Sequence, residues 1–141
     1  MTSPLYNLEI LKLAASTSAL NRLDSPQVSI EKRSPTCGSR VRIDMDVDPD
    51  GRVQAMGADL HACALGQAST ALMVAHAHGQ SAQDLADARD ALRAYLKGER
   101  SQPGDWPGLE IFAPARKHAG RHASILLAFE AAAEAAKAAS H

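Results

Sequence analysis

The two cysteines, Cys37 and Cys63, are the side chains whose type and position most clearly indicate chemistry in this sequence. Cys37 stands in Ser-Pro-Thr-Cys-Gly-Ser at positions 34–39, which predicts a tight loop, and Cys63 directly precedes a predicted helix. The unpaired amide groups and the dipole at the start of a helix favour an anion, so a thiolate there is available to bind a metal or sulfur. Small half-buried cysteines are also common and inert, so the positions alone leave both interpretations open.

The segment between the cysteines predicts that the two thiols lie close together. Residues 41–47 alternate apolar with charged side chains, which is the pattern of a strand with one buried face. Residues 48–51, Asp-Pro-Asp-Gly, form a turn sequence, so residues 52–60 are expected to return as the antiparallel partner. In such a hairpin the start of the first strand lies beside the end of the second, and the cysteines stand at these two places.

Other periodicities predict helices around this hairpin and one further strand. The expected elements are an N-terminal helix within 1–23, a strand at 27–31, helices at 63–79 and 81–98, an irregular connector at 99–114 and a final helix at 121–139. The final helix is expected to pack Ile125, Leu126, Phe129 and Ala132 inward, and helix propensity with no packing partner is an alternative explanation of its alanine-rich end. Residues 1–141 are thus expected to form a single α+β domain: a three-stranded antiparallel sheet with helices packed on one face, and N-terminal and C-terminal helices.

Composition fits this single domain and argues against several classes of function. The 141 residues are 45% hydrophobic and 22% charged, which suits one globular core. With 15 Lys and Arg against 16 Asp and Glu, the net charge of −1 gives no basic excess for binding nucleic acid. No apolar run is long enough to span a membrane, so we expect a cytoplasmic protein. Two cysteines are also too few for a disulfide framework or a zinc finger.

The six histidines, at positions 61, 76, 78, 118, 122 and 141, give a weaker signal than the cysteines. Most of them are expected to be solvated. His76 falls on an apolar helical face, where a packed side chain is a simpler expectation than a metal ligand.

The sequence around both cysteines resembles the N-terminal domain of the NifU family, which includes the IscU and SufU scaffolds of iron–sulfur cluster assembly. Ser-Pro-Thr-Cys-Gly-Ser at 34–39 resembles the family's Asn-Pro-x-Cys-Gly-Asp motif. Cys63 followed by Ala68-Ser69 resembles the family's second cysteine and its Ala-Ser pair. Further along, Leu109-Glu110 and residues 114–116 resemble SufU, and Arg121-His122 opens the final helix. The resemblance covers nearly the whole chain.

The resemblance implies a scaffold-like protein with no catalytic reaction of its own. Iron or a labile iron–sulfur cluster, such as a [2Fe-2S] cluster, would be bound through Cys37 and Cys63, with His122 as a third metal ligand and zinc as the alternative metal. The implied partners are a cysteine desulfurase, recipient apoproteins and a chaperone. The implied state is a monomer or a weak homodimer.

Two departures from the family's pattern leave the ligand set incomplete. The carboxylate that follows the first cysteine is replaced by Ser39. The third cysteine falls at Ala123 if His122 matches the family's histidine, and at Ser124 if the register is set on Leu127 and Phe129, which moves that histidine to Ala123. In both registers a thiolate is missing.

Three outcomes for the site stay open at this point. They are a cluster bridged between two subunits, a single iron or zinc held by two thiolates, His and water, and a site that no longer binds metal. The function has two alternatives as well. One is a cluster-free paralogue that acts as an interaction or regulatory partner of the assembly machinery, and the other is a zinc-dependent sulfur acceptor of the SufU type, with persulfide on Cys37 or Cys63.

Overall fold

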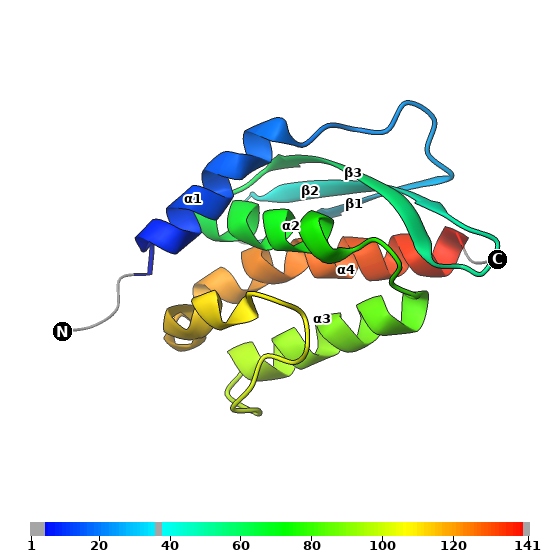
Figure 1. Cartoon of the computed structure of the whole chain (residues 1–141). Coiled ribbons are helices and arrows are strands. Elements are labelled where there is room, and N and C mark those ends of the chain that lie inside the picture. Colours follow the sequence, from blue (N-terminus) through cyan, green and yellow to red (C-terminus); the bar gives the residue numbers. More distant parts are fainter. Residues whose placement is uncertain (1–4, 36–37, 140–141) are drawn as a thin grey trace.

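The computed structural model describes residues 5–35 and 38–139 of the chain. The elements follow in the order α1 (Leu8–Ser16), η1 (Thr17–Ala19), β1 (Val28–Arg33), β2 (Arg40–Val47), β3 (Val53–His61), α2 (Ala64–His76), α3 (Ala82–Leu96), η2 (Leu109–Lys117), η3 (Ala119–Arg121) and α4 (His122–Ala139), where η marks a 3-10 helix. Figure 1 shows their arrangement. No helix in these residues has the length and apolarity to cross a membrane.

The sheet is three-stranded and antiparallel in the order β1-β2-β3, so the predicted α+β class is confirmed. As the alternation of residues 41–47 predicts, Val41, Ile43 and Met45 are fully buried on the inner face of the sheet. Register pairs Arg40 with His61, which places the start of β2 beside the end of β3. The hairpin therefore places side by side the two ends of the segment that lies between the cysteines in the sequence.

Helices α2 and α4 pack on one face of the sheet (Figure 1). Helix α4 contacts β1 and β2 directly, and α2 lies beside it against β3. Helix α3 covers α4 on the side away from the sheet, and α1 packs on α2. Helix α4 is thus the central element, since it lies between the sheet and α3.

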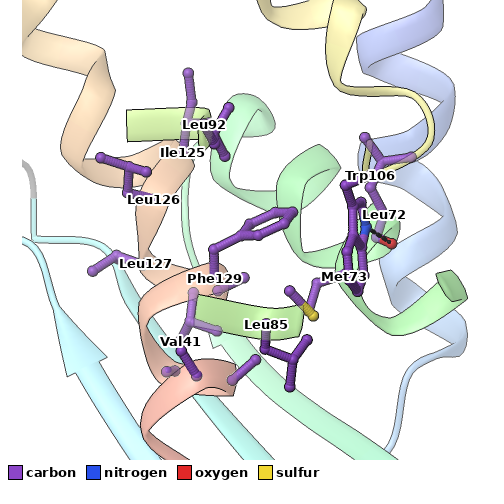
Figure 2. Close-up of a cluster of buried hydrophobic side chains, with 14 of the residues drawn as sticks. Val41, Leu72, Met73, Leu85, Leu92, Trp106, Ile125, Leu126, Leu127 and Phe129 are labelled. Carbon is purple, nitrogen blue, oxygen red and sulfur yellow. Dashed lines mark hydrogen bonds between the residues drawn. The ribbon is translucent and has the colours of Figure 1, made fainter. Parts of the chain in front are cut away.

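The core forms where α2, α3 and α4 meet, as Figure 2 shows for a cluster around Phe129. The ring of Trp106 packs edge-on against Phe129 with 5.5 Å between ring centroids. The Trp106 Nε1–H donates a hydrogen bond of 3.0 Å to the Leu72 carbonyl, which satisfies the indole while its ring is buried. This anchor fixes the segment between α3 and η2 to the last part of α2.

The alanine-rich end of α4 has packing partners, so Ala132 is buried as expected and the alternative of propensity with no partner is wrong. Its alanines at 128, 131, 132, 133, 135 and 136 are all buried. Small side chains let a helix lie close to its neighbours, so α4 can contact the sheet on one side and α3 on the other. Packing, in addition to propensity, therefore accounts for this composition.

The N-terminal helix is shorter than the predicted segment 1–23. It starts at Leu8, where Asn7 accepts a hydrogen bond from the amide of Ile10, and it ends at Ser16. The hydroxyl groups of Ser16, Thr17 and Ser18 donate to backbone carbonyls three residues earlier. Such side-chain bonds compete with helix continuation, and the backbone becomes extended at Leu20.

The predicted irregular connector 99–114 is also partly wrong, because residues from Leu109 onward form η2. The buried residues of η2 are Leu109, Phe112 and Ala115. This spacing of three matches the 3.0 residues per turn of a 3-10 helix and places one apolar row against the core. Such a row does not follow the 3.6-residue period of an α-helix, which is why the sequence did not predict it.

The outer face of the sheet is crossed by the segment that joins α1 to β1. The amide of Ala58 in β3 donates to the Asn21 carbonyl at 3.1 Å. A Cβ atom on Gly57 would lie 2.6 Å from the Asn21 carbonyl oxygen and 2.8 Å from the Leu23 nitrogen. Only glycine at position 57 leaves room for this crossing.

Asp44 anchors the same segment to β2. Its carboxylate is fully buried and accepts hydrogen bonds from Arg22 Nε at 3.0 Å, Ser29 Oγ at 2.6 Å and the Leu23 amide at 3.1 Å. Burial alone would raise the pKa of Asp44, but these hydrogen bonds outweigh it and lower the pKa below its ordinary value. The charged carboxylate therefore stabilises the crossing segment.

We predict that stability falls in acid partly through Asp44. Because its folded-state pKa lies below the unfolded value of about 3.9, the stabilisation is complete above that pH and is lost as the pH falls through the folded pKa. At neutral pH, Asp44→Asn should lower the free energy of unfolding by about 2 kcal/mol. Urea unfolding at about pH 7 and about pH 3 should also show a smaller acid effect in the variant than in the parent.

The matched control is Asp59→Asn, on the same face of the sheet, where the carboxylate is half exposed and paired with Arg40. It should change stability by about 0.5 kcal/mol or less. The backbone amide of Ser81 also lowers the pKa of Asp84, so the Asp44 variant should retain part of the acid effect. Equal losses in the Asp44 and Asp59 variants would contradict the assigned role of Asp44.

Candidate functional site

Cys63 lies at the N-terminus of α2, as the sequence predicts. It is the residue directly before the helix, with extended backbone angles, and its side chain makes no capping hydrogen bond. The Gln67 amide donates to the Cys63 carbonyl at 2.9 Å, which closes the first helical turn. Cys63 is a half-buried free thiol, so solvent still reaches it at the start of the helix.

Cys37 lies outside the described residues, so the closeness of the two thiols stays a prediction. The two flanks of its loop are described. The Ser34 amide donates to the Ser39 carbonyl at 2.8 Å, which joins those flanks, and Gly38 has a positive φ of 72°. Glycine adopts this backbone conformation without steric cost, in accord with the predicted tight loop.

Two buried serines connect the loop to Cys63. The Ser39 and Ser124 hydroxyl oxygens are 3.2 Å apart, and Ser124 Oγ is 3.4 Å from Cys63 Sγ. Ser39 is 4% exposed and Ser124 is 1% exposed. The start of β2, the start of α2 and the first turn of α4 therefore meet at one point. Of the two positions considered for the missing cysteine, Ser124 is the one in contact with Cys63.

The close approach of α4 to α2 depends on two small residues of α2. A Cβ atom on Gly66 would lie 2.7 Å from Ser124 Oγ and 2.9 Å from the Ala62 Cβ. One turn later, Ser69 Oγ donates to the Ile125 carbonyl. Ser69 matches the family's Ala-Ser pair, but the positioning roles of Gly66 and Ser69 are not evident from the sequence. A glycine inside a predicted helix was the available signal for Gly66.

His122 is close to this point in sequence but its side chain has a different neighbour. Its Nε2 is 2.9 Å from the Ala115 carbonyl oxygen in η2. Residues two apart on a helix do not face each other, so the side chains of His122 and Ser124 leave α4 in different directions. If Nε2–H donates to Ala115, Nδ1 is the nitrogen left for a metal, so the ligand role of His122 stays a prediction.

The expectation that His76 is packed in the core is wrong. His76 is exposed at the end of α2, with its ring edge-on to Trp106 at 6.5 Å between centroids. The apolar face to which the periodicity assigned it consists of the buried Leu65, Ala68 and Leu72. His61 and His118 are exposed too, as expected for most of the histidines.

The donor atoms at the meeting point are one thiol and two hydroxyls. Across residues 5–35 and 38–139, no group of three or more His, Cys, Asp or Glu side chains is placed to hold a metal ion. Serine hydroxyls are neutral near pH 7 and are much poorer ligands for iron or zinc than thiolates. A metal at this point therefore needs donors beyond Cys63, Ser39 and Ser124.

Comparisons with known proteins identify the family. The sequence matches no protein-family model and no curated protein. Among solved structures, it matches the N-terminal part of a nitrogen-fixing NifU-like protein from Brucella abortus with 34% sequence identity and a TM-score of 0.89, over 96% of this chain and 94% of that chain. This chain belongs to the NifU-like N-terminal family.

Two more distant structures share the fold of this NifU-like chain. One is a SufU protein from the thermophile Fervidobacterium islandicum, with 17% identity and a TM-score of 0.85 over 94% of this chain and 96% of that chain. The other is a hypothetical protein with 22% identity and a TM-score of 0.79 over 94% of this chain and 99% of that chain. Their likeness extends across the sheet and the helices that position Cys63.

Basic side chains surround the same end of this NifU-like chain. Residues 114–122 contain no Asp or Glu. Lys117, His118 and Arg121 are exposed, and neither Lys117 nor Arg121 forms an ion pair with another described residue. These residues precede Ser124 by a few positions, and α4 begins at the same end of the molecule as α2 (Figure 1), so their positive charge lies near the site.

We predict that Gly66→Ala destabilises this NifU-like chain although alanine is the better helix former. The added methyl group would overlap Ser124 and Ala62, and the resulting shift of α4 should lower the free energy of unfolding by about 1–3 kcal/mol. Gly120→Ala is the control, since nothing lies within 4 Å of a Cβ atom there. Urea unfolding measures both variants, and equal stabilities would contradict the close approach.

Proposed function

We propose that this chain takes part in iron–sulfur cluster assembly by binding iron or a labile cluster through Cys37 and Cys63. The observation that carries the proposal is the position of Cys63, at the start of α2 and 3.4 Å from Ser124, in a chain of the NifU-like family. The SufU structure that shares this fold is described as a scaffold for iron–sulfur cluster assembly in the SUF system. Scaffold proteins of this type are not enzymes.

The chemistry of the site supports binding of iron or a cluster that is later released to another protein. Thiolates bind iron strongly, and cysteine thiolates are the usual ligands of iron–sulfur clusters. Cys63 is half-buried, so a delivered ion or sulfide reaches it and a recipient protein can approach. With neutral hydroxyls beside it, the site would hold its cargo less tightly than four thiolates do.

Partners follow from this role as part of the proposal. A cysteine desulfurase would supply sulfur, recipient apoproteins would take the cluster, and a chaperone would assist the transfer. All of these would act in the cytoplasm, where thiols stay reduced. The exposed basic segment next to the site offers such proteins a surface for acidic side chains.

The direct prediction is that Cys37→Ser and Cys63→Ser each abolish bound iron and acid-labile sulfide. Both contents are measured after purification and reconstitution without oxygen, because thiolates are the iron ligands and serine hydroxyls are not ionised near pH 7. His78→Ala is the matched control, since His78 is exposed and lies after the far end of α2, and it should retain full iron and sulfide. Unchanged metal content in both cysteine variants would refute the proposed site.

The same measurement on His122→Ala decides whether His122 is the third ligand. If His122 binds the metal through Nδ1, the variant should hold much less metal than the parent. If its role is the hydrogen bond to the Ala115 carbonyl, the metal content should stay unchanged. Analysis for zinc alongside iron distinguishes a cluster carrier from the zinc-dependent sulfur acceptor. Zinc without sulfide would favour the sulfur acceptor.

A second candidate function is favoured by the two buried serines. Ser39 and Ser124 occupy the site with neutral hydroxyls, which are poor ligands for iron. In this alternative the chain holds no cluster and acts as a partner that regulates the assembly proteins. Co-purification with a cysteine desulfurase, together with the absence of iron and sulfide after reconstitution, would support this role over the first.

A further inference from the structure

We propose that the buried Ser124 hydroxyl donates a hydrogen bond to the Cys63 sulfur when that sulfur binds a metal, and that Ser39 in turn donates to Ser124. In this role Ser124 is a positioning residue that stabilises the bound thiolate, and it is not itself a ligand. The inference rests on the proposed function, because it concerns how the protein supports the same metal-binding thiol.

The first argument is the geometry of the three side chains. Ser124 Oγ is 3.4 Å from Cys63 Sγ and 3.2 Å from Ser39 Oγ. Among the described residues, these two atoms are the hydrogen-bonding neighbours of the Ser124 hydroxyl. One hydroxyl thus connects the thiol at the start of α2 to the serine at the start of β2.

The second argument is the number of protons that the three groups share. A thiol and a serine hydroxyl each carry one proton, and each can donate or accept a hydrogen bond, so the free Cys63 thiol can donate to Ser124. A metal-bound thiolate can only accept, because its proton leaves to solvent as the metal–sulfur bond forms. Ser124 must then donate its single proton to the sulfur. The contact between the two serines therefore requires the proton of Ser39.

The third argument is that the Ser124 hydroxyl can change the direction in which it donates, unlike two hydroxyls nearby. Ser69 Oγ donates to the Ile125 carbonyl, and Thr70 Oγ1 donates to the Gly66 carbonyl. A carbonyl oxygen only accepts, so the direction of these two bonds is fixed. Both neighbours of Ser124 can donate or accept, so its proton can point to the sulfur once a metal binds.

The fourth argument is burial, which places the hydroxyl behind the sulfur. Ser124 is 1% exposed and Ser39 is 4% exposed, whereas Cys63 is half-buried. A metal can therefore approach Cys63 from its exposed side while Ser124 contacts the sulfur from the interior. Hydrogen bonds to charged groups are stronger where water is excluded, so a buried donor is well placed to stabilise a bound thiolate.

The test is a titration with cobalt(II) without oxygen. Cobalt(II) stands in for ferrous iron or zinc, and its bond to a thiolate gives a charge-transfer band in the absorption spectrum. The parent is compared with Ser124→Ala. Thr70→Val is the matched control, because it removes an equally buried hydroxyl that bonds the Gly66 carbonyl and not the sulfur. Circular dichroism establishes that each variant is folded.

For Ser124→Ala we expect cobalt to bind about three- to tenfold more weakly than to the parent, because one hydrogen bond to a charged group is lost. We also expect the charge-transfer band to move to lower energy, because a thiolate without a hydrogen-bond donor gives up electron density more easily. Thr70→Val should keep the cobalt affinity and the band energy of the parent. A purely structural role of Ser124 would not move the band.

Ser39→Ala tests the order of the two hydrogen bonds. If Ser39 acts through Ser124, its replacement should move the band in the same direction by a smaller amount. The effect should be smaller again when Ser124→Ala is already present, because the two residues act in series. If Ser124→Ala does not fold, the result for Ser39→Ala decides the inference.

Two results would overturn the inference while leaving the proposed function intact. One is an unchanged cobalt affinity and band energy in Ser124→Ala. The other is complete loss of the band in Ser124→Ala, as expected for Cys63→Ser, because Ser124 would then be a ligand itself. A parent chain that gives no charge-transfer band would instead count against the proposed function, on which the inference rests.

Discussion

The close approach of α4 to α2 is the constraint on which the site depends. Gly66 leaves the space that Ser124 occupies, and Ser69 fixes the next residue of α4 by bonding the Ile125 carbonyl. Because α4 lies between the sheet and α3, a shift of this helix would disturb both layers. The neighbours of Cys63 are therefore set by the packing of the whole domain, and the local sequence around the cysteine does not determine them.

Serine at positions 39 and 124 preserves this packing while it changes the chemistry. A serine hydroxyl is smaller than the carboxylate or the thiol of the family's pattern, and the hydroxyls of Ser39 and Ser124 bond to each other at 3.2 Å. What is lost is negative charge and affinity for soft metals. The packing at this site thus depends on side-chain volume, whereas its affinity for metal depends on which atoms ionise.

Much of the architecture could be predicted because its signals are local. The alternation in β2 and the Asp-Gly turn after it each involve residues within a few positions of one another, and both elements form as expected. The ends of α1 and the presence of η2 were missed, because hydroxyl back-bonding and a three-residue period compete with the α-helical pattern that was sought. The contact between Ser124 and Cys63 was beyond the sequence, since adjacent helical residues differ by about 100° and this contact spans 61 positions.

The segment that crosses the outer face of the sheet also affects how the chain associates. An uncovered edge strand offers free backbone groups to a strand of another molecule and so promotes fibrillar aggregation. At the β3 edge, the Ala58 amide is already bonded to Asn21, and at the β1 edge three consecutive charged residues, Glu31, Lys32 and Arg33, disfavour such pairing. Both edges of the sheet are thus protected against strand addition.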